Sequence, residues 1–410
     1  MNCHEFLKKG LPVRFLLRFL FLFILPIFLA IFFLEQAEAR VLLLPSLTVS
    51  EEYNDNFFFT SPHKEEELAT AINPALTLRY ESPAVILAII YTGGLRLQLK
   101  NEMPEEYTQR LNFNLALPLL AGTVDGVDIR ITELFDHTPE IPSVPLGGQT
   151  RETFGTGLGR INTSRNLASI GVGYPWSPRF RTDLTYLNTV VLYEGDLPED
   201  SFSHNGDIRG SYNLSQTAQG TLDYGVRVTR FRFSKGFTEQ RMTVGATNQI
   251  TATFFARGSI GGSLLSENRT ALISDIGFTK QIEQVAVTGG YVRRVTTAGD
   301  IARPTSTPAV SSQALTQTLS AGMSYPMNTT TTFALTVNYT QTDGLSDLLI
   351  KTNTRTISAS ASHTFFPWLV GAVRYAYLNF QNERIMIQDI SSNRVLFSLT
   401  ASDPGLRLMR

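Results

Sequence analysis

Apolar side chains recur at every second position through most of the chain beyond residue 40, with small or polar side chains between them. In residues 329–339 the apolar set is Phe333, Leu335, Val337 and Tyr339. The same alternation runs through residues 111–117, 179–191, 221–228 and 394–400. A period of two is typical of a β-strand with two different faces. The pattern therefore predicts an all-β protein, and no comparable helical period follows residue 40.

Strand length and aromatic placement separate a membrane barrel from a soluble sandwich, because both architectures alternate. Many of the predicted strands run for about 11–15 residues, whereas strands of soluble sheets average about 5–6. Aromatic residues gather near the predicted strand ends, as in the girdles of membrane barrels: Tyr53, Phe57, Tyr80, Tyr174, Phe231, Phe233, Tyr325, Phe365, Phe366, Trp368, Tyr377 and Phe380. We expect a transmembrane, antiparallel, up-and-down β-barrel in which one strand face meets lipid and the other lines a polar lumen.

Two kinds of connection alternate along the predicted strands. Short turns are expected near residues 81–84, 118–122, 175–178, 213–216, 249–251, 281–283, 326–329 and 365–367. Longer polar loops are expected near residues 60–68, 100–106, 137–153, 195–201, 234–239, 266–270, 298–311, 342–352 and 381–392. Eight turns between nine loops give about 18 strands (16–20), and an even number is the bacterial outer-membrane pattern. Both termini would then lie on the periplasmic side.

The first 39 residues have the pattern of a secretory signal peptide. Lys8, Lys9 and Arg14 precede an apolar run over residues 20–34, and Ala37-Glu38-Ala39 supplies small residues at a cleavage site. We therefore expect a signal peptide at residues 1–39 and a single outer-membrane barrel domain at residues 40–410. Export of such a chain predicts the outer membrane of a Gram-negative bacterium as its location.

Composition narrows the class of partner. The 410 residues include 35 Lys and Arg against 36 Asp and Glu, and only 17% of residues are charged. A balanced charge argues against nucleic acid as a partner. The single cysteine, Cys3, lies in the signal segment, which excludes a disulfide framework or a cysteine metal cluster in the mature chain. Outer-membrane lipid and the barrel insertion machinery are the expected partners, and the oligomeric state is open.

The segment Pro45-Ser46-Leu47-Thr48-Val49-Ser50-Glu51-Glu52-Tyr53-Asn54-Asp55-Asn56-Phe57-Phe58 resembles the first strand of barrels from exosortase/PEP-CTERM and exopolysaccharide loci, the EpsL-like and β-barrel porin type 2 groups. Residues 173–182 and 211–217 are similar to the periplasmic turns of that family. The resemblance implies a porin-like conduit linked to export or assembly of extracellular polysaccharide, without catalytic residues. One departure is the end of the chain, because it continues past Thr400 to Arg410 and lacks a terminal aromatic residue.

Candidate functional residues follow from the alternation. Charged side chains expected on the lumen face, where they would set ion selectivity, are Arg96, Arg130, Arg181, Asp183, Asp223, Arg227 and Arg394. Arginine predominates among them, which favours an anion-preferring lumen. A stiff loop at residues 137–153 is a candidate constriction that could fold into the lumen or stay outside in solvent; its marked residues are Pro139, Pro142, Pro145, Gly147 and Gly148.

No cofactor, metal or catalytic site is predicted. The run Asn54-Asp55-Asn56 could bind a cation through oxygen ligands, but capping of the strand end is the favoured interpretation because Asn and Asp side chains bind nearby backbone in turns. Four histidines in the mature chain have no partner at metal spacing.

Three functions remain open from the sequence. The first is an outer-membrane conduit linked to polysaccharide export, the second is a general diffusion porin for small solutes, and the third is a structural or adhesion barrel with a plugged lumen. Bilayer conductance would separate the third from the other two.

Overall fold

The structure is a computed structural model of the 410-residue chain. It describes residues 40–57, 63–83, 85–100, 106–117, 126–139, 162–194, 200–233, 235–266, 268–297, 313–345, 351–382, 389–403 and 406–409. The predicted signal segment, residues 1–39, lies outside the described residues. Within them, no helix has the length and apolar character needed to cross a membrane.

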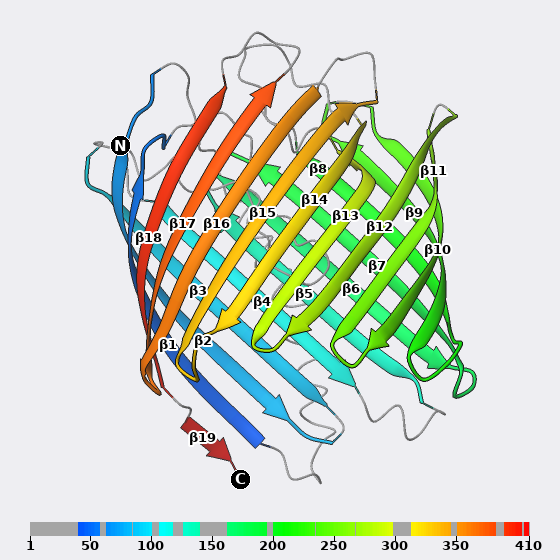
Figure 1. Ribbon diagram of the computed structural model, residues 1–410, viewed down its shortest axis with the longest axis horizontal. Helices are drawn as coiled ribbons and strands as arrows, with labels where there is room; N and C mark the ends of the chain where they lie inside the picture. Colours follow the sequence, from blue (N-terminus) through cyan, green and yellow to red (C-terminus); the bar gives the residue numbers. More distant parts are fainter. Residues whose placement is uncertain are drawn as a thin grey trace, which may run out of the picture.

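The described chain forms one closed antiparallel sheet of long strands that tilt across the barrel wall (Figure 1). Eighteen long strands and one short terminal strand are present in the described residues: β1 (Arg40–Asn54), β2 (Glu67–Glu81), β3 (Ile86–Gln98), β4 (Glu106–Leu117), β5 (Asp128–Thr138), β6 (Thr163–Pro175), β7 (Phe180–Tyr193), β8 (Ser201–Asn213), β9 (Ala218–Phe231), β10 (Phe237–Thr251), β11 (Phe254–Leu265), β12 (Arg269–Ile282), β13 (Val285–Thr297), β14 (Gln313–Pro326), β15 (Thr331–Gly344), β16 (Lys351–Phe366), β17 (Leu369–Asn382), β18 (Ile390–Ser402) and β19 (Leu406–Met409). The predicted barrel of about 18 strands is confirmed.

The barrel closes where β1 pairs with β18. This ladder runs from Ser46 opposite Ser402 to Asn54 opposite Arg394, while the other edge of β1 pairs with β2 over its whole length. The chain end adds a feature that the sequence did not predict, because β19 pairs with residues 41–43 of β1. The segment beyond β18 therefore covers part of the β1 edge that β18 leaves open. Closure of this kind gives backbone groups partners inside the sheet, which a hydrocarbon environment requires.

Connections of two kinds lie at opposite ends of the barrel. The eight links that begin after even-numbered strands up to β16 form one end, which we call the turn end, and most span two to four residues. The nine links after odd-numbered strands form the other end, the loop end, and include the longest connections. The predicted turns agree with these positions to within about two residues where the chain is described. Residues 118–125, in one expected turn, lie outside the described residues.

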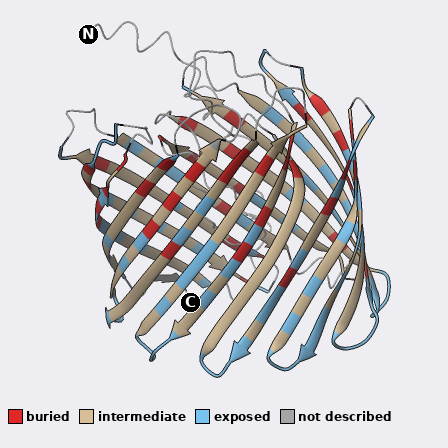
Figure 2. Ribbon diagram, turned by 45° about the horizontal axis from the view of Figure 1, so that its top comes forward, coloured by how far each residue is buried: buried red, intermediate tan, exposed pale blue. Residues whose placement is uncertain are grey.

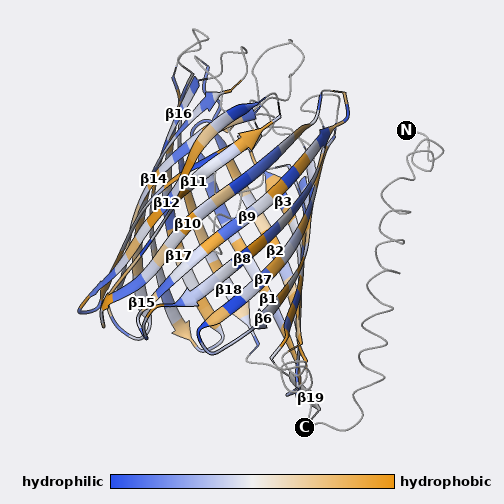
Figure 3. Ribbon diagram, turned by 90° about the vertical axis from the view of Figure 1, so that its right-hand side faces the viewer, coloured by the Kyte–Doolittle hydropathy of each residue, from blue (hydrophilic) through white to orange (hydrophobic). Residues whose placement is uncertain are grey.

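Alternation along the strands separates an apolar outer face from a polar inner face, and bands of opposite hydropathy cross the wall in Figure 3. On β15, Phe333, Leu335 and Val337 are about 40% exposed at the outer surface. Their ladder partners on the neighbouring strands are also outward, for example Ile357 beside Val337. Apolar side chains exposed around a closed sheet match the lipid-facing band of a transmembrane barrel.

Tyrosines on the outer face form a girdle at about the middle of the strands or nearer the loop end. Six phenolic hydroxyls bond a polar group one step nearer that end: Tyr53 to Glu66 at 2.9 Å, Tyr186 to His204 at 2.7 Å, Tyr224 to Gln240 at 3.4 Å, Tyr291 to Gln317 at 2.9 Å, Tyr339 to Asn353 at 3.2 Å, and Tyr375 to Asn393 at 2.7 Å. A tyrosine with an apolar ring and a hydroxyl in a polar layer is the side chain expected at a membrane interface.

Polar side chains next to the closure bind the first strand to the last. Ser392 Oγ donates to Asn54 Oδ1 at 2.7 Å, and the Asn393 backbone N–H donates to Asp55 Oδ1 at 2.6 Å. The Asn56 N–H also bonds Asn54 Oδ1 at 3.0 Å, which is the local turn bond expected of a cap. The capping interpretation of Asn54-Asp55-Asn56 is confirmed, and no cluster of metal ligands occurs in the part of the chain that the structure describes.

A buried carboxylate on the inner face holds three strands at the same closure. Glu52 on β1 accepts bonds from Arg96 of β3 at 2.7 Å and Arg394 of β18 at 2.5 Å. The Glu52 and Arg96 side chains are only 8% and 9% exposed. The Arg96 guanidinium also lies 5.4 Å from the centre of the fully buried Phe57 ring. Glu52 is thus the nearest carboxylate to both cations, and Glu106 lies 4.0 Å from Arg96 Nε.

Replacement of Glu52 by alanine should destabilise the barrel strongly. Removal of the carboxylate takes the shortest ion pair from two guanidinium groups, and breaking a buried pair typically costs about 3–5 kcal/mol. We expect a lower urea midpoint for Glu52→Ala in detergent micelles, followed by tryptophan fluorescence. The matched control is Glu51→Ala, because Glu51 is exposed on the outer face and bonds only the Thr70 hydroxyl in the described contacts. Equal midpoints for the two variants would contradict this role of Glu52.

Candidate functional site

The seven charged residues predicted to line the lumen all lie on the inner face, and the structure pairs each with an opposite charge. Arg96 and Arg394 share Glu52, Arg227 pairs with Glu239 at 2.5 Å, and the others belong to aspartate pairs. The sequence pattern placed these side chains on the correct face. It did not identify their partners, because cross-strand register decides which residues of two strands meet.

Burial divides these ion pairs into two groups. Near the loop end, Glu52, Arg96 and Glu239 are nearly buried, and Figure 2 shows buried positions gathered in the half of the wall nearest the loops. Nearer the turn end, the paired side chains are a quarter to nearly three quarters exposed, for example Arg209 at 60% and Arg130 at 71%. Only the second group is open to a solute in the lumen. The first group is buried within the wall and connects its strands.

We call the exposed group the lumen charge wall. It spans the inner faces of β5 to β12 and consists of Asp128, Arg130, Arg181, Asp183, Asp207, Arg209, Asp223, Arg241, Arg257 and Asp275. The wall therefore holds five arginines and five aspartates, and its formal charges cancel. All ten side chains lie within described strands.

Two glycines allow arginines of this wall to reach across an intervening strand. Arg181 on β7 bonds Asp128 of β5 at 2.9 Å, and Gly173 of β6 lies beneath its guanidinium. A Cβ on Gly173 would lie 1.8 Å from Arg181 Nη2. In the same way, Arg241 of β10 bonds Asp207 of β8 at 2.5 Å across Gly225. No sequence pattern predicts this use of glycine, since the partners of the two ion pairs are 34 and 53 residues apart along the chain.

The opposite side of the lumen has a different chemistry, which we call the hydroxyl wall. It is the inner face of β14–β16, on the side of the barrel facing β5–β7 in Figure 1. Ladder rows such as Thr318–Thr340–Thr354 and Thr316–Thr342–Thr352 place hydroxyls on this inner face, where Thr318 bonds Thr340 and where Thr342 and Thr352 are buried. No Asp, Glu, Lys or Arg side chain lies on this inner face in the described residues. The inner face of these three strands therefore carries no charged residue of its own, although Arg374 of the neighbouring β17 donates to Ser358 Oγ of β16 at 3.1 Å.

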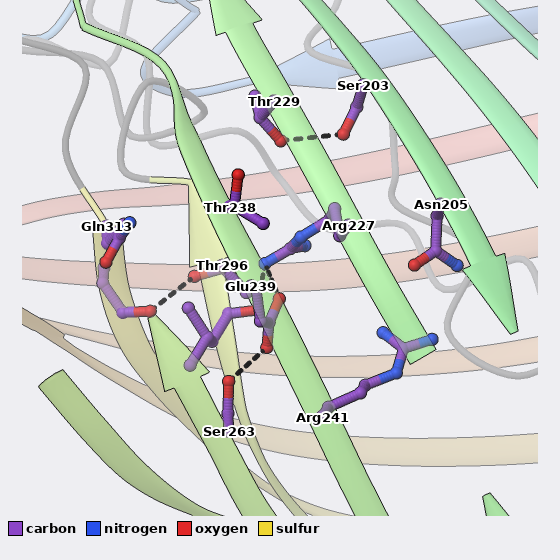
Figure 4. A network of polar contacts seen from close by, with 12 residues as sticks. Ser203, Asn205, Arg227, Thr229, Thr238, Glu239, Arg241, Ser263, Thr296 and Gln313 are labelled. Carbon is purple, nitrogen blue, oxygen red and sulfur yellow. Dashed lines mark hydrogen bonds and ion pairs between the residues drawn. The ribbon is translucent and has the colours of Figure 1, made fainter. Parts of the chain in front are cut away.

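At the loop end, β13 leaves its neighbour and lies against the inside of the wall. The β12–β13 ladder stops at Ser274 opposite Arg293, although β12 and β13 each continue beyond it. The end of β13 instead receives a bond from Arg227 Nη2 to the Val295 carbonyl at 3.2 Å. Figure 4 shows Thr296 and Gln313, from β13 and β14, beside Arg227 and Glu239 on the barrel wall. This inward displacement narrows the mouth of the barrel.

Apolar packing accompanies the same displacement. Val295 lies in a buried cluster with Leu265, Ala271 and Leu315, and Leu345 packs against it. Ser263 Oγ donates to Glu239 Oε1 at 2.7 Å beside this cluster. The mouth is thus shaped by a segment that the sequence did not single out. The predicted constriction lies mostly outside the described residues: Pro139 is described at the end of β5, whereas Pro142, Pro145, Gly147 and Gly148 are not.

Charge in the loop-end connections also forms local pairs. The Lys100 ammonium and the Tyr53 hydroxyl both donate to the Glu66 carboxylate. These bonds, with Lys100 the stronger influence, hold the pKa of Glu66 below its ordinary value. The Glu66 carboxylate therefore stays ionised to a lower pH than an isolated glutamate.

Comparisons with known proteins find similar solved structures at low sequence identity. OpdQ of Pseudomonas aeruginosa is 12% identical, with 90% of this chain and 98% of that chain covered and a TM-score of 0.46. OccK7 (OpdD) of the same species is 11% identical, with coverage of 90% and 100% and a TM-score of 0.48. OccAB4 of Acinetobacter baumannii is 9% identical, with coverage of 88% and 98% and a TM-score of 0.47. No protein-family model and no curated protein matches the chain. The barrel assignment rests on the strand ladders themselves.

Replacement of Gly225 by alanine should disturb the Asp207–Arg241 pair while leaving every charge in place. The new Cβ would lie 2.1 Å from Asp207 Oδ1 and 2.9 Å from Arg241 Nε, so both side chains must move into the lumen. We expect lower single-channel conductance in planar bilayers. Folding stability should change by about 1 kcal/mol or less, because exposed ion pairs contribute little.

Gly206→Ala is the control for this substitution. Gly206 lies on the adjacent strand with its Cβ direction toward the outer face, and nothing lies within 4 Å of that position. The conductance of the Gly206→Ala channel should equal that of the unmodified protein. A Gly225→Ala channel with unchanged conductance would show that the ion pair does not border the conducting path.

Proposed function

We propose that the protein is an outer-membrane porin through which small polar solutes diffuse passively. The observation that carries the proposal is a water-exposed, charge-balanced wall inside a closed barrel of 18 long strands. Barrels of about 16–18 strands are too wide for their own side chains to fill and typically leave an aqueous channel. This corresponds to the general diffusion porin among the functions left open by the sequence.

The paired charges favour weak ion selectivity. The residues predicted from the sequence include more lumen arginines than aspartates, which favoured anions. Three of those arginines, Arg96, Arg227 and Arg394, belong to the less exposed pairs with Glu52 and Glu239. The exposed residues that the prediction left out are three aspartates and three arginines: Asp128, Asp207, Asp275, Arg209, Arg241 and Arg257. Each exposed arginine of the charge wall has a carboxylate beside it, which offsets its attraction for anions. We therefore propose a lumen with little preference between small anions and cations.

We further propose that the turn end faces the periplasm and the loop end faces the cell exterior. Short periplasmic turns and longer external loops are the usual arrangement of outer-membrane barrels. Both ends of the described barrel chain, Arg40 and β19, lie at the turn end, which agrees with export of the chain before insertion. Insertion would need the barrel insertion machinery, and lipid would cover the outer band.

The link to extracellular polysaccharide rests on the motif resemblance alone, and it stands second to general diffusion. The inward position of the β13 end favours passage of small solutes over a polymer, because it takes up space at the mouth. A plugged structural barrel is the third candidate, and conductance decides it.

Single-channel recording of the purified mature chain tests these candidates together. We expect a shift in gel mobility on heating, steady conductance in a planar bilayer, and a reversal potential near zero in a salt gradient. Stable folding without conductance would contradict the porin and favour the structural barrel. A strongly anion-selective reversal potential would contradict charge balance as the controlling feature. Block of the current by long-chain polysaccharide, but not by short oligosaccharides, would favour the polysaccharide role.

A further inference from the structure

The exposed ion pairs offer both signs of charge to one small molecule. Arg181 bonds Asp183 at 2.7 Å and Asp128 at 2.9 Å, and the three side chains are 37%, 33% and 24% exposed. A solute beside them meets a cation and an anion within the space of neighbouring strands. An isolated ion is attracted by one member of each pair and repelled by the other, so its net gain is small.

Opposite charges also alternate along a single row of the sheet. Asp183 of β7 stands opposite Arg209 of β8, which stands opposite Asp223 of β9. Directly opposed residues of antiparallel strands are about 5 Å apart. The signs along this row are negative, positive and negative, and Asp207 with Arg241 forms another pair close to it. A molecule that carries two opposite charges a few bonds apart can bind one pair of this row after another.

The opposite side of the lumen offers fewer charges to such a solute. The hydroxyl wall has hydrogen-bonding groups and no charged residue on the inner face of β14–β16 in the described strands, and Arg374 of β17 is bonded to its Ser358. The field beside the lumen charge wall changes sign over short distances. A dipolar solute gains more from this field than a neutral molecule of equal size, because each of its ends can face an opposite charge.

We propose that the lumen charge wall is a path for zwitterionic solutes of the amino-acid type, which carry one ammonium and one carboxylate. This inference rests on the proposed porin function, since it requires an open lumen. The carboxylate of the solute binds an exposed guanidinium such as Arg209 or Arg241, and its ammonium binds the neighbouring aspartate. Exchange from pair to pair is easy because exposed ion pairs are individually weak.

Liposome swelling with two isomers tests the proposal. Alanine is a zwitterion, and lactamide is its neutral isomer with the same atoms. The full mature chain is reconstituted, and the swelling rates in the two solutes are compared. We expect alanine to enter about threefold faster than lactamide, the size of effect that one exposed ion pair can give. Equal rates for the two isomers would overturn the zwitterion preference while leaving the pore intact.

The double variant D207N/R241Q removes one charge of each sign and leaves the net charge unchanged. It should bring the alanine rate close to the lactamide rate, with lactamide entry unaffected. R209Q/D223N is the second such variant, for use if the first does not fold. The matched control is R232Q/D200N, because Arg232 and Asp200 form a similar pair 3.6 Å apart at the loop end, outside the strands.

The control should keep the full alanine preference. A control that loses the preference as completely as D207N/R241Q would overturn the assignment to the lumen charge wall. Liposomes impermeable to both isomers would overturn the porin function, and the zwitterion path with it. These outcomes separate failure of the pore from failure of the preference.

Discussion

The structure depends on one constraint, which is that backbone amides in hydrocarbon must find partners within the sheet. A closed ladder meets this requirement, and the β1–β18 pairing completes it. Because the number of long strands is even, β1 and β18 meet as an antiparallel pair. Their register keeps inside and outside consistent around the whole ring, as the inward Glu52 and Arg394 on the two closing strands show. The tyrosine girdle outside and the charged side chains inside both depend on that consistent alternation.

The lumen also has to hold charged side chains in a wide pore. Arginine and aspartate occur together, so that the wall stays hydrated without a large net field. Buried pairs near the loop end serve the wall itself, since Arg227 binds Glu239 and also the backbone of β13. Arginine pairs with glutamate in the buried positions and with aspartate in the exposed ones, so ion pairs have different roles at different depths. Exposure to the lumen decides which role a pair has.

Features that depend on the local alternation of residues were predicted from the sequence. Features that depend on the register between strands were not. Alternation around Val337 and the turn signals gave the strands, their number and the inward direction of Arg181 and Asp223. The Asp128–Arg181 pair depends on how β5, β6 and β7 align, and no local pattern encodes that alignment. The separation of β13 from β12 was equally invisible, because Val295 has the same alternation as any strand residue.

The tyrosine girdle has a consequence for how the barrel sits in its membrane. Each of its hydroxyls is bonded toward the loop end, so all six rings are anchored in one direction. Vertical sliding by even one row would pull these hydroxyls away from the polar layer or drag their partners into hydrocarbon, at a cost around the whole circumference. The barrel is therefore fixed in height, and a bilayer of different thickness must adapt by stretching or compressing its own lipid chains against the wall.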